Sequence, residues 1–140
     1  MPKPLKVLIL DDEEIVCKRI KPAIEKMGCE VEAFQDPIKA LQRIVEGDKL
    51  DIIVTDVRMD EVDGIQVLER AKGVNPDTRV IVITGYAMMA LAREAMQKGA
   101  FDFVSKPFKP NDIRKVILRA AEDLGTPLDY EIAEENPDSD

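Results

Sequence analysis

The sequence predicts an α/β fold: a doubly wound (βα)5 three-layer sandwich, with a parallel five-stranded sheet between two layers of helices. Short apolar runs of strand length alternate five times with segments of helical period, which is the pattern of βαβ units. The first run, Val-Leu-Ile-Leu, is almost continuously apolar, as expected for a strand buried on both faces. A length of 140 residues suits a single domain with one solid core.

Five segments are predicted as strands because they are short and apolar and are bounded by polar or turn residues. The segment 30–34 reads Glu-Val-Glu-Ala-Phe, and this alternation favours a place nearer the edge of the sheet. The predicted strands are 6–10, 30–34, 51–55, 79–84 and 100–105.

Five further segments carry apolar residues at helical spacing. Asp36-Pro37 is typical of a helix start, with Asp as the N-cap and Pro at the first helical position, and Gly47 ends the same helix. In the first predicted helix one apolar stripe comprises Val16, Ile20, Ala23, Ile24 and Met27. The predicted helices are 13–27, 37–46, 64–72, 87–98 and a last one that begins at 110.

The net charge of −8 is concentrated at the C-terminal end of the chain. Six acidic residues and no Lys or Arg follow Leu124, so the rest of the chain is close to neutral. We therefore expect a folded domain over 1–124 and an acidic, largely disordered tail over 125–140. Because no basic face is evident, direct nucleic-acid binding is not expected.

Several absences narrow the classes of function. No apolar stretch approaches the ~18–20 residues of a membrane span, and the N-terminus lacks a signal-peptide pattern, so we expect a cytoplasmic protein. Cys17 and Cys29 lack metal-binding spacing and are interpreted as reduced thiols. The chain has no His, which excludes His-based nucleophile activation and a phosphohistidine on this chain.

Polar side chains follow four of the predicted strands. Asp11-Asp12, Asp56, Thr84 and Lys106 each stand at or just past an apolar run. The carboxyl ends of parallel strands meet at one edge of the sheet, so these groups are expected to converge. Two carboxylates ~4 Å apart repel by about 4 kcal/mol at an effective dielectric of ~20, which favours a bound cation, and Mg²⁺ prefers oxygen ligands. A carboxylate can also attack a phosphoryl group as a nucleophile.

Taken singly, each of these residues has an ordinary explanation. Asp11 is a plausible helix N-cap, Thr84 a hydroxyl bonded to its own backbone, Lys106 a solvated charge and Phe103 a core residue. These explanations do not account for all of them standing together at strand ends. The joint pattern therefore predicts one site.

At these positions the sequence resembles the receiver domain of bacterial two-component response regulators. The resemblance covers about residues 5–122 and includes Asp63-Gly64, Lys106-Pro107-Phe108 and the segment 98–103. It implies the strand order 2-1-3-4-5 and favours a cis peptide before Pro107. One departure is Asp60, where family members often carry Pro.

The resemblance also implies a role for each site residue. Asp56 would be the phosphoacceptor, and Mg²⁺ would be bound directly by Asp12 and Asp56, through water by Asp11 and by the backbone carbonyl of Arg58. Thr84 and Lys106 would contact the phosphoryl group. Phe103 would be the aromatic residue that changes rotamer on activation.

By the same resemblance the chain is a signalling module, not a turnover enzyme. Its phosphoryl group would come from a histidine kinase or a phosphotransfer protein, and Ile15 and Arg19 would help to dock that partner. The signal would pass to a downstream protein or to a missing effector domain. A phosphorylation-dependent homodimer is a further alternative.

Two other classes of function compete with this interpretation. One is an aspartyl-phosphate-forming phosphohydrolase, although Arg58 stands where such enzymes carry a second Asp. The other is a flavin-binding electron carrier, although no phosphate-binding loop follows the first strand.

Overall fold

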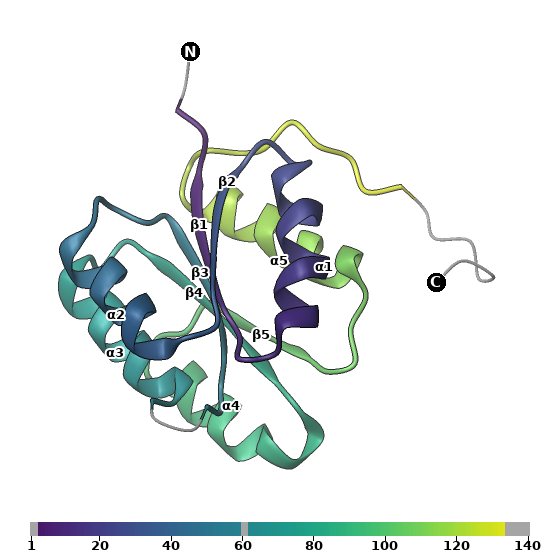
Figure 1. Cartoon of the computed structure of the whole chain (residues 1–140). Helices are drawn as coiled ribbons and strands as arrows, with labels where there is room; N and C mark the ends of the chain where they lie inside the picture. Colours follow the sequence, from purple (N-terminus) through teal and green to yellow (C-terminus); the bar gives the residue numbers. More distant parts are fainter. Residues whose placement is uncertain (1–2, 60–61, 134–140) are drawn as a thin grey trace.

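In the computed structural model, which describes residues 3–59 and 62–133, five parallel strands form one sheet in the order β2-β1-β3-β4-β5. The predicted fold class and strand order are confirmed. β1 runs from the N-terminal end at the top of Figure 1 to the lower edge of the sheet. The strands are β1 (Lys6–Leu10), β2 (Glu30–Phe34), β3 (Ile52–Asp56), β4 (Arg79–Thr84) and β5 (Asp102–Ser105).

Helices cover both faces of the sheet. One layer holds α1 and α5, and the other holds α2, α3 and α4 (Figure 1). A 3₁₀ turn, η1 (Tyr86–Met88), precedes α4. The helices are α1 (Glu14–Glu25), α2 (Pro37–Glu46), α3 (Gly64–Val74), α4 (Met89–Gln97) and α5 (Pro110–Asp123).

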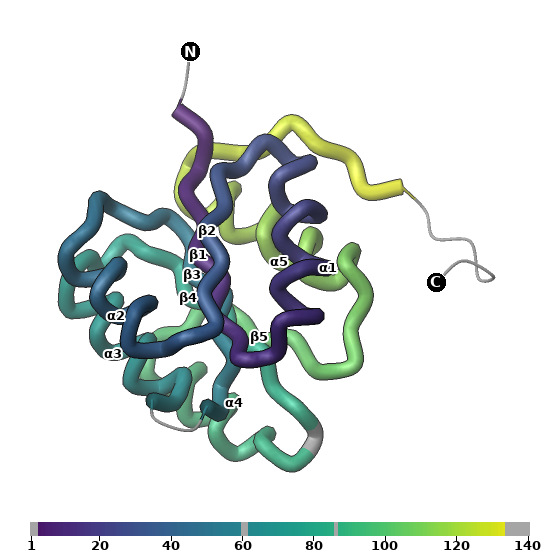
Figure 2. The backbone as a smooth tube through the Cα atoms, in the orientation of Figure 1, coloured from purple at the N-terminus to yellow at the C-terminus, as the bar shows by residue number. Residues whose placement is uncertain are grey.

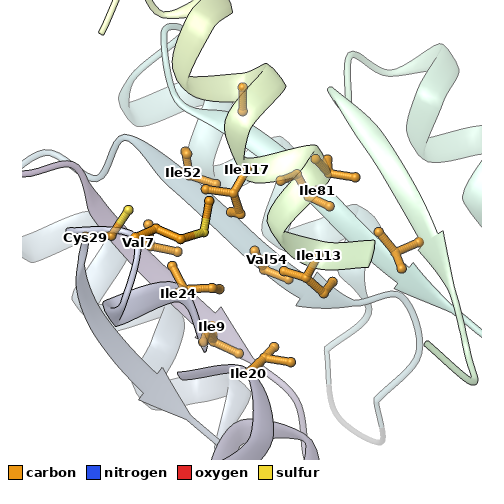
Figure 3. Close-up of a cluster of buried hydrophobic side chains, with 14 of the residues drawn as sticks. Val7, Ile9, Ile20, Ile24, Cys29, Ile52, Val54, Ile81, Ile113 and Ile117 are labelled. Atoms are coloured by element: carbon orange, nitrogen blue, oxygen red, sulfur yellow. The ribbon is translucent and has the colours of Figure 1, made fainter. Parts of the chain in front are cut away.

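Alternate residues of the strands pack into two separate hydrophobic clusters. In β1, Val7 and Ile9 face the layer of α1 and α5, whereas Leu8 and Leu10 face the opposite layer. Figure 3 shows the first cluster, in which Ile20 of α1 and Ile113 of α5 pack over the central strands. Each fully buried side chain of this kind stabilises the fold by about 1.5–3 kcal/mol. The free energy from this packing offsets the repulsion between like charges that lie close together at the edge of the sheet.

Element boundaries differ from the predicted ones by one or two residues at several places. β3 extends to Asp56, because the next amide, that of Val57, still donates to Ile83 O of β4 at 2.9 Å. The predicted fifth strand begins too early, because Ala100 N closes the end of α4 on Ala95 O at 2.9 Å, with Gly99 at φ +102°. The single helix predicted over 87–98 is instead η1 followed by α4.

The segment after α5 folds back onto the domain. The side chains of Leu128 and Tyr130 pack against the cluster beneath α1 and α5, and the Arg114 guanidinium lies 5.6 Å from the centre of the Tyr130 ring. Figure 2 traces this segment from the end of α5 across the top of that layer. Residues 134–140 lie outside the described residues, and both the domain boundary at 124 and the disordered tail over 125–140 stay predictions.

Among the described residues, no helix combines the length and the apolar character needed to cross a bilayer.

Candidate functional site at the carboxyl edge of the sheet

Strand register sets the candidate residues in one row along the carboxyl edge of the sheet. β1 and β3 pair so that Asp11 and Asp56 are neighbours just beyond the last paired residues of the two strands. The pairing of β3 with β4 brings Asp56 beside the end of β4, where Thr84 is the last residue. Thr84 in turn pairs with the last residue of β5, so Lys106 follows one step beyond.

Asp56 is a largely buried carboxylate with two polar neighbours. Its Oδ1 accepts a hydrogen bond from the backbone N–H of Arg58 at 3.3 Å, and its Oδ2 lies 3.4 Å from Lys106 Nζ. Burial raises the pKa of Asp56, and the charge of Lys106 and the Arg58 N–H oppose that rise without cancelling it. The negative charge of Asp56 is therefore only partly compensated.

The loop after Asp56 is held by the start of α3. Asp63 and Gln66 form a reciprocal capping box, with Gln66 N donating to Asp63 Oδ1 and Asp63 N donating to Gln66 Oε1, both at 2.9 Å. Gly64 N donates to Val57 O at 2.8 Å. A Cβ on Gly64 would stand 2.7 Å from Asp56 O, so only glycine lets the helix approach this closely.

Lys106 is the cation of the site and contacts three carboxylates. Its Nζ lies 2.8 Å from Glu13 Oε1, 3.2 Å from Asp11 Oδ2 and 3.4 Å from Asp56 Oδ2. Burial works against the charged form, but the hydrogen bond to Glu13 and the charges of Asp56 and Asp11 together outweigh it, so the pKa of Lys106 lies above its ordinary value. The ammonium is thus held protonated at the centre of the cluster.

Asp11 is fully buried and carries the least satisfied carboxylate of the group. Its Oδ1 accepts a hydrogen bond from Glu13 N at 2.8 Å, whereas its Oδ2 accepts none and meets Lys106 only as an ion-pair contact. Burial, with the charge of Asp56, raises the pKa of Asp11 from 3.8 to about 6, although the Glu13 N–H and Lys106 act to lower it.

The donor set fits a hard divalent cation. Asp11, Asp12, Glu13 and Asp56 can each offer a ligand atom, and these atoms lie within 4.8 Å of one another. The buried Oδ2 of Asp11 meets the Lys106 ammonium at 3.2 Å without a well-formed hydrogen bond, so this oxygen already faces one cation and has capacity left for another. All the donors are carboxylate oxygens, the ligands that suit Mg²⁺.

The other predicted residues lie around this cluster. The Thr84 hydroxyl is buried and donates to the adjacent backbone carbonyl, Gly85 O, at 3.1 Å, so in this state it is bonded to the backbone and not to another group of the site. Phe103 is half-buried against the cluster beneath α2–α4. The Arg58 guanidinium turns toward Met88, with Nη1 3.9 Å from Sδ. Asp60 lies outside the described residues. The Lys106–Pro107 peptide is cis.

Sequence reasoning missed Glu13 as a member of the site. The run Asp11-Asp12-Glu13-Glu14 offered a signal, because it places a third acidic residue directly after the two strand-end carboxylates. Acidic residues at the start of a helix are common for the unrelated reason that they complement the helix dipole, so the run alone did not single out Glu13.

Comparison with known proteins gives a match over most of the chain. A family model described as the response regulator receiver domain matches residues 7–118. The photosynthetic apparatus regulatory protein RegA of Rhodobacter capsulatus is 33% identical over 121 residues, which are 86% of this chain and 65% of RegA. The regulatory protein AtoC of Escherichia coli is 34% identical over 115 residues, which are 82% of this chain and 25% of AtoC. Both relatives are therefore longer than the part that this chain matches.

A solved structure agrees with this match. The response regulator receiver domain protein from Clostridium thermocellum superposes with a TM-score of 0.80 at 30% identity, covering 85% of this chain and 95% of that one.

Proposed function

The chain belongs to the response regulator receiver domain family, and from this premise we propose that Asp56 accepts a phosphoryl group from the phosphohistidine of a partner protein, with Mg²⁺ at the adjacent carboxylates. One observation carries the proposal. Asp56 stands at the end of the central strand, in contact with Lys106 and within a cluster of four carboxylates that lacks a matching positive charge. This arrangement supports transfer of an anionic group once a cation has bound.

The transfer step follows from the chemistry of the carboxylate. An Oδ atom of Asp56 forms a bond to phosphorus while the bond from phosphorus to the partner's imidazole nitrogen breaks, and that nitrogen keeps the electron pair. Asp11, Asp12, Asp56 and the Arg58 carbonyl would hold Mg²⁺, which neutralises charge on the phosphoryl oxygens. Lys106 supplies a second positive charge, and the Thr84 hydroxyl supplies a hydrogen-bond donor.

A groove beside the site supports docking of the phosphodonor protein there. The groove has a volume of about 350 Å³ and is lined by Ile15, Arg19 and Phe108 together with Glu13 and Lys106. Ile15 is 62% exposed, an unusual state for a large apolar side chain next to a charged cluster. A helix of a histidine kinase or phosphotransfer protein that covers Ile15 would present its phosphohistidine to Asp56.

The proposed output is a change of the surface formed by α4, β5 and α5. A phosphoryl group adds about −1.5 to −2 charge and three acceptor oxygens, enough to draw the Thr84 hydroxyl away from Gly85 O. That movement would leave space for Phe103 to turn inward. A downstream protein, an effector domain such as the extra length of the relatives allows, or a second copy of the chain would then bind the altered surface.

Intact mass spectrometry tests the assignment of Asp56. The wild-type chain, Asp56→Asn and Asp77→Asn are incubated with Mg²⁺ and a small phosphodonor, with EDTA in parallel. We expect one phosphoryl increment on wild type and on Asp77→Asn, none on Asp56→Asn, and loss of the increment in EDTA. An undiminished increment on Asp56→Asn refutes the assignment, and multiple turnover of a phosphomonoester favours the phosphohydrolase instead.

A further inference from the structure

Glu13 makes the shortest contact of Lys106 in the site. Lys106 Nζ lies 2.8 Å from Glu13 Oε1, closer than it lies to Asp11 or to Asp56. Glu13 is also the N-cap residue of α1, yet its carboxylate makes no capping hydrogen bond. The side chain therefore reaches across to Lys106, just past the end of β5, and makes no capping hydrogen bond to the first turn of its own helix.

The backbone of Glu13 is fixed while its carboxylate stays accessible. Glu13 N donates to Asp11 Oδ1 at 2.8 Å, and Glu13 O accepts from Val16 N at 3.1 Å, so the residue is anchored between the site and α1. The Glu13 side chain is 55% exposed, whereas that of Lys106 is 24% exposed. An exposed carboxylate can release the ammonium without leaving a buried charge behind, which neither Asp11 nor Asp56 can do.

A phosphoryl group on Asp56 would compete with Glu13 for the same ammonium. It would bring about −1.5 to −2 charge and three acceptor oxygens next to a lysine whose nearest partner is already Glu13. Glu13 also has the same sign of charge as the incoming group and so repels it.

We propose that Glu13 is a positioning residue that holds Lys106 in the unphosphorylated protein and competes with the phosphoryl group for its ammonium. The inference rests on the proposed function of Asp56. The same negative charge attracts Mg²⁺, so Glu13 acts in opposite directions on the two ligands. Loss of its charge strengthens binding of a phosphoryl group at saturating Mg²⁺ and slightly weakens binding of Mg²⁺ alone.

Beryllofluoride binding measured by ¹⁹F NMR at saturating Mg²⁺ tests the inference on wild type, Glu13→Gln and Glu14→Gln. Glu14 is the matched control, because it is the next residue, is similarly exposed and pairs with Lys18 at 2.8 Å. Partly exposed ion pairs correspond to changes of up to about fivefold in an equilibrium constant. We expect Glu13→Gln to bind beryllofluoride about two- to fivefold more tightly than wild type, and Glu14→Gln to match wild type.

The outcomes separate this inference from the proposed function. If wild type binds beryllofluoride and Glu13→Gln binds it equally or less tightly, the inference fails and the proposed function stands. If wild type does not bind it, the proposed function fails. A Mg²⁺ titration without beryllofluoride adds a second readout, since a loss of more than about tenfold in Glu13→Gln makes Glu13 a metal ligand and overturns the competition.

The rate at which the protons of the Lys106 ammonium exchange with water, measured by NMR without Mg²⁺, reports the contact with Glu13 directly. It should be faster in Glu13→Gln than in Glu14→Gln, and equal rates contradict the inference.

Discussion

Replacing the buried Asp11 by Asn should stabilise the protein when no metal is bound. The Asp11 side chain is fully buried, and its pKa in the folded state is about 6 against 3.8 for an unperturbed aspartate. At about 1.4 kcal/mol per pH unit of pKa difference, keeping this carboxyl ionised lowers the unfolding free energy by about 3 kcal/mol at neutral pH. Asn keeps an acceptor for the Glu13 N–H and carries no charge.

The pH dependence gives this prediction a definite sign. Because the folded-state pKa of Asp11 is raised, its contribution to stability is fully present below pH 3.8 and is lost as pH rises through about 6. The advantage of Asp11→Asn over wild type should therefore grow from about 1 kcal/mol at pH 4.5 to about 3 kcal/mol at pH 7.5, and then level off.

Urea denaturation in EDTA across this pH range measures the difference. The control is Asp48→Asn, because the hydrogen bond from Lys6 lowers the pKa of the exposed Asp48 carboxyl, so its contribution is present above pH 3.8 and is lost as pH falls. Asp48→Asn should thus be less stable than wild type at pH 7.5. A pH-independent difference between Asp11→Asn and wild type, or a less stable Asp11→Asn at pH 7.5, would refute the electrostatic argument.

Mg²⁺ should narrow the difference in stability between Asp11→Asn and wild type. A ligand that binds only the folded state stabilises it by about 1.4 kcal/mol when present at tenfold its Kd. Wild type should gain this increment in the same urea assay, and Asp11→Asn should gain less because one carboxylate of the cluster is missing. An equal gain in both proteins would remove Asp11 from the metal site.

Two further substitutions test the packing around the site and the C-terminal segment. Gly64→Ala should lower the unfolding free energy by about 1–3 kcal/mol and slow phosphorylation in the mass assay, because its Cβ would stand 2.7 Å from Asp56 O. Gly73→Ala in the same helix meets no atom within 4 Å and should be neutral or stabilising in urea. Tyr130→Ala should lower the unfolding free energy by about 1–2 kcal/mol through lost packing and the lost Arg114 contact, and should speed amide exchange over 126–131, whereas Tyr130→Phe should not.

The fold was predictable because its signals are local and repeated. Most strands are apolar runs, β2 alternates polar and apolar residues, and each helix carries an apolar stripe. The alternation of such strands and helices along the chain therefore indicates a parallel sheet with helices on both faces. The convergence of Asp11, Asp56, Thr84 and Lys106 was predictable for a related reason, since parallel strands end at the same edge.

What the sequence did not reveal depends on contacts between distant residues. Nothing local marks Glu13 as the partner of Lys106, which is 93 residues away. Likewise, the acidic segment after α5 has the composition of a disordered tail, yet Leu128 and Tyr130 find an apolar surface and the Arg114 guanidinium. Composition averages over a segment, whereas two well-placed apolar side chains are enough to hold it.

The charges of the site also argue for an order of events. One ammonium, that of Lys106, faces Asp11, Glu13 and Asp56, so the cluster binds a dianionic phosphoryl group poorly before a cation enters. Mg²⁺ held by the carboxylates would add two positive charges, and a phosphoryl group on Asp56 would then return about two negative charges and compete with Glu13 for Lys106. Each ligand would thus offset the net charge that the previous state leaves, and the excess of negative charge in the cluster favours binding of the metal before the phosphoryl group.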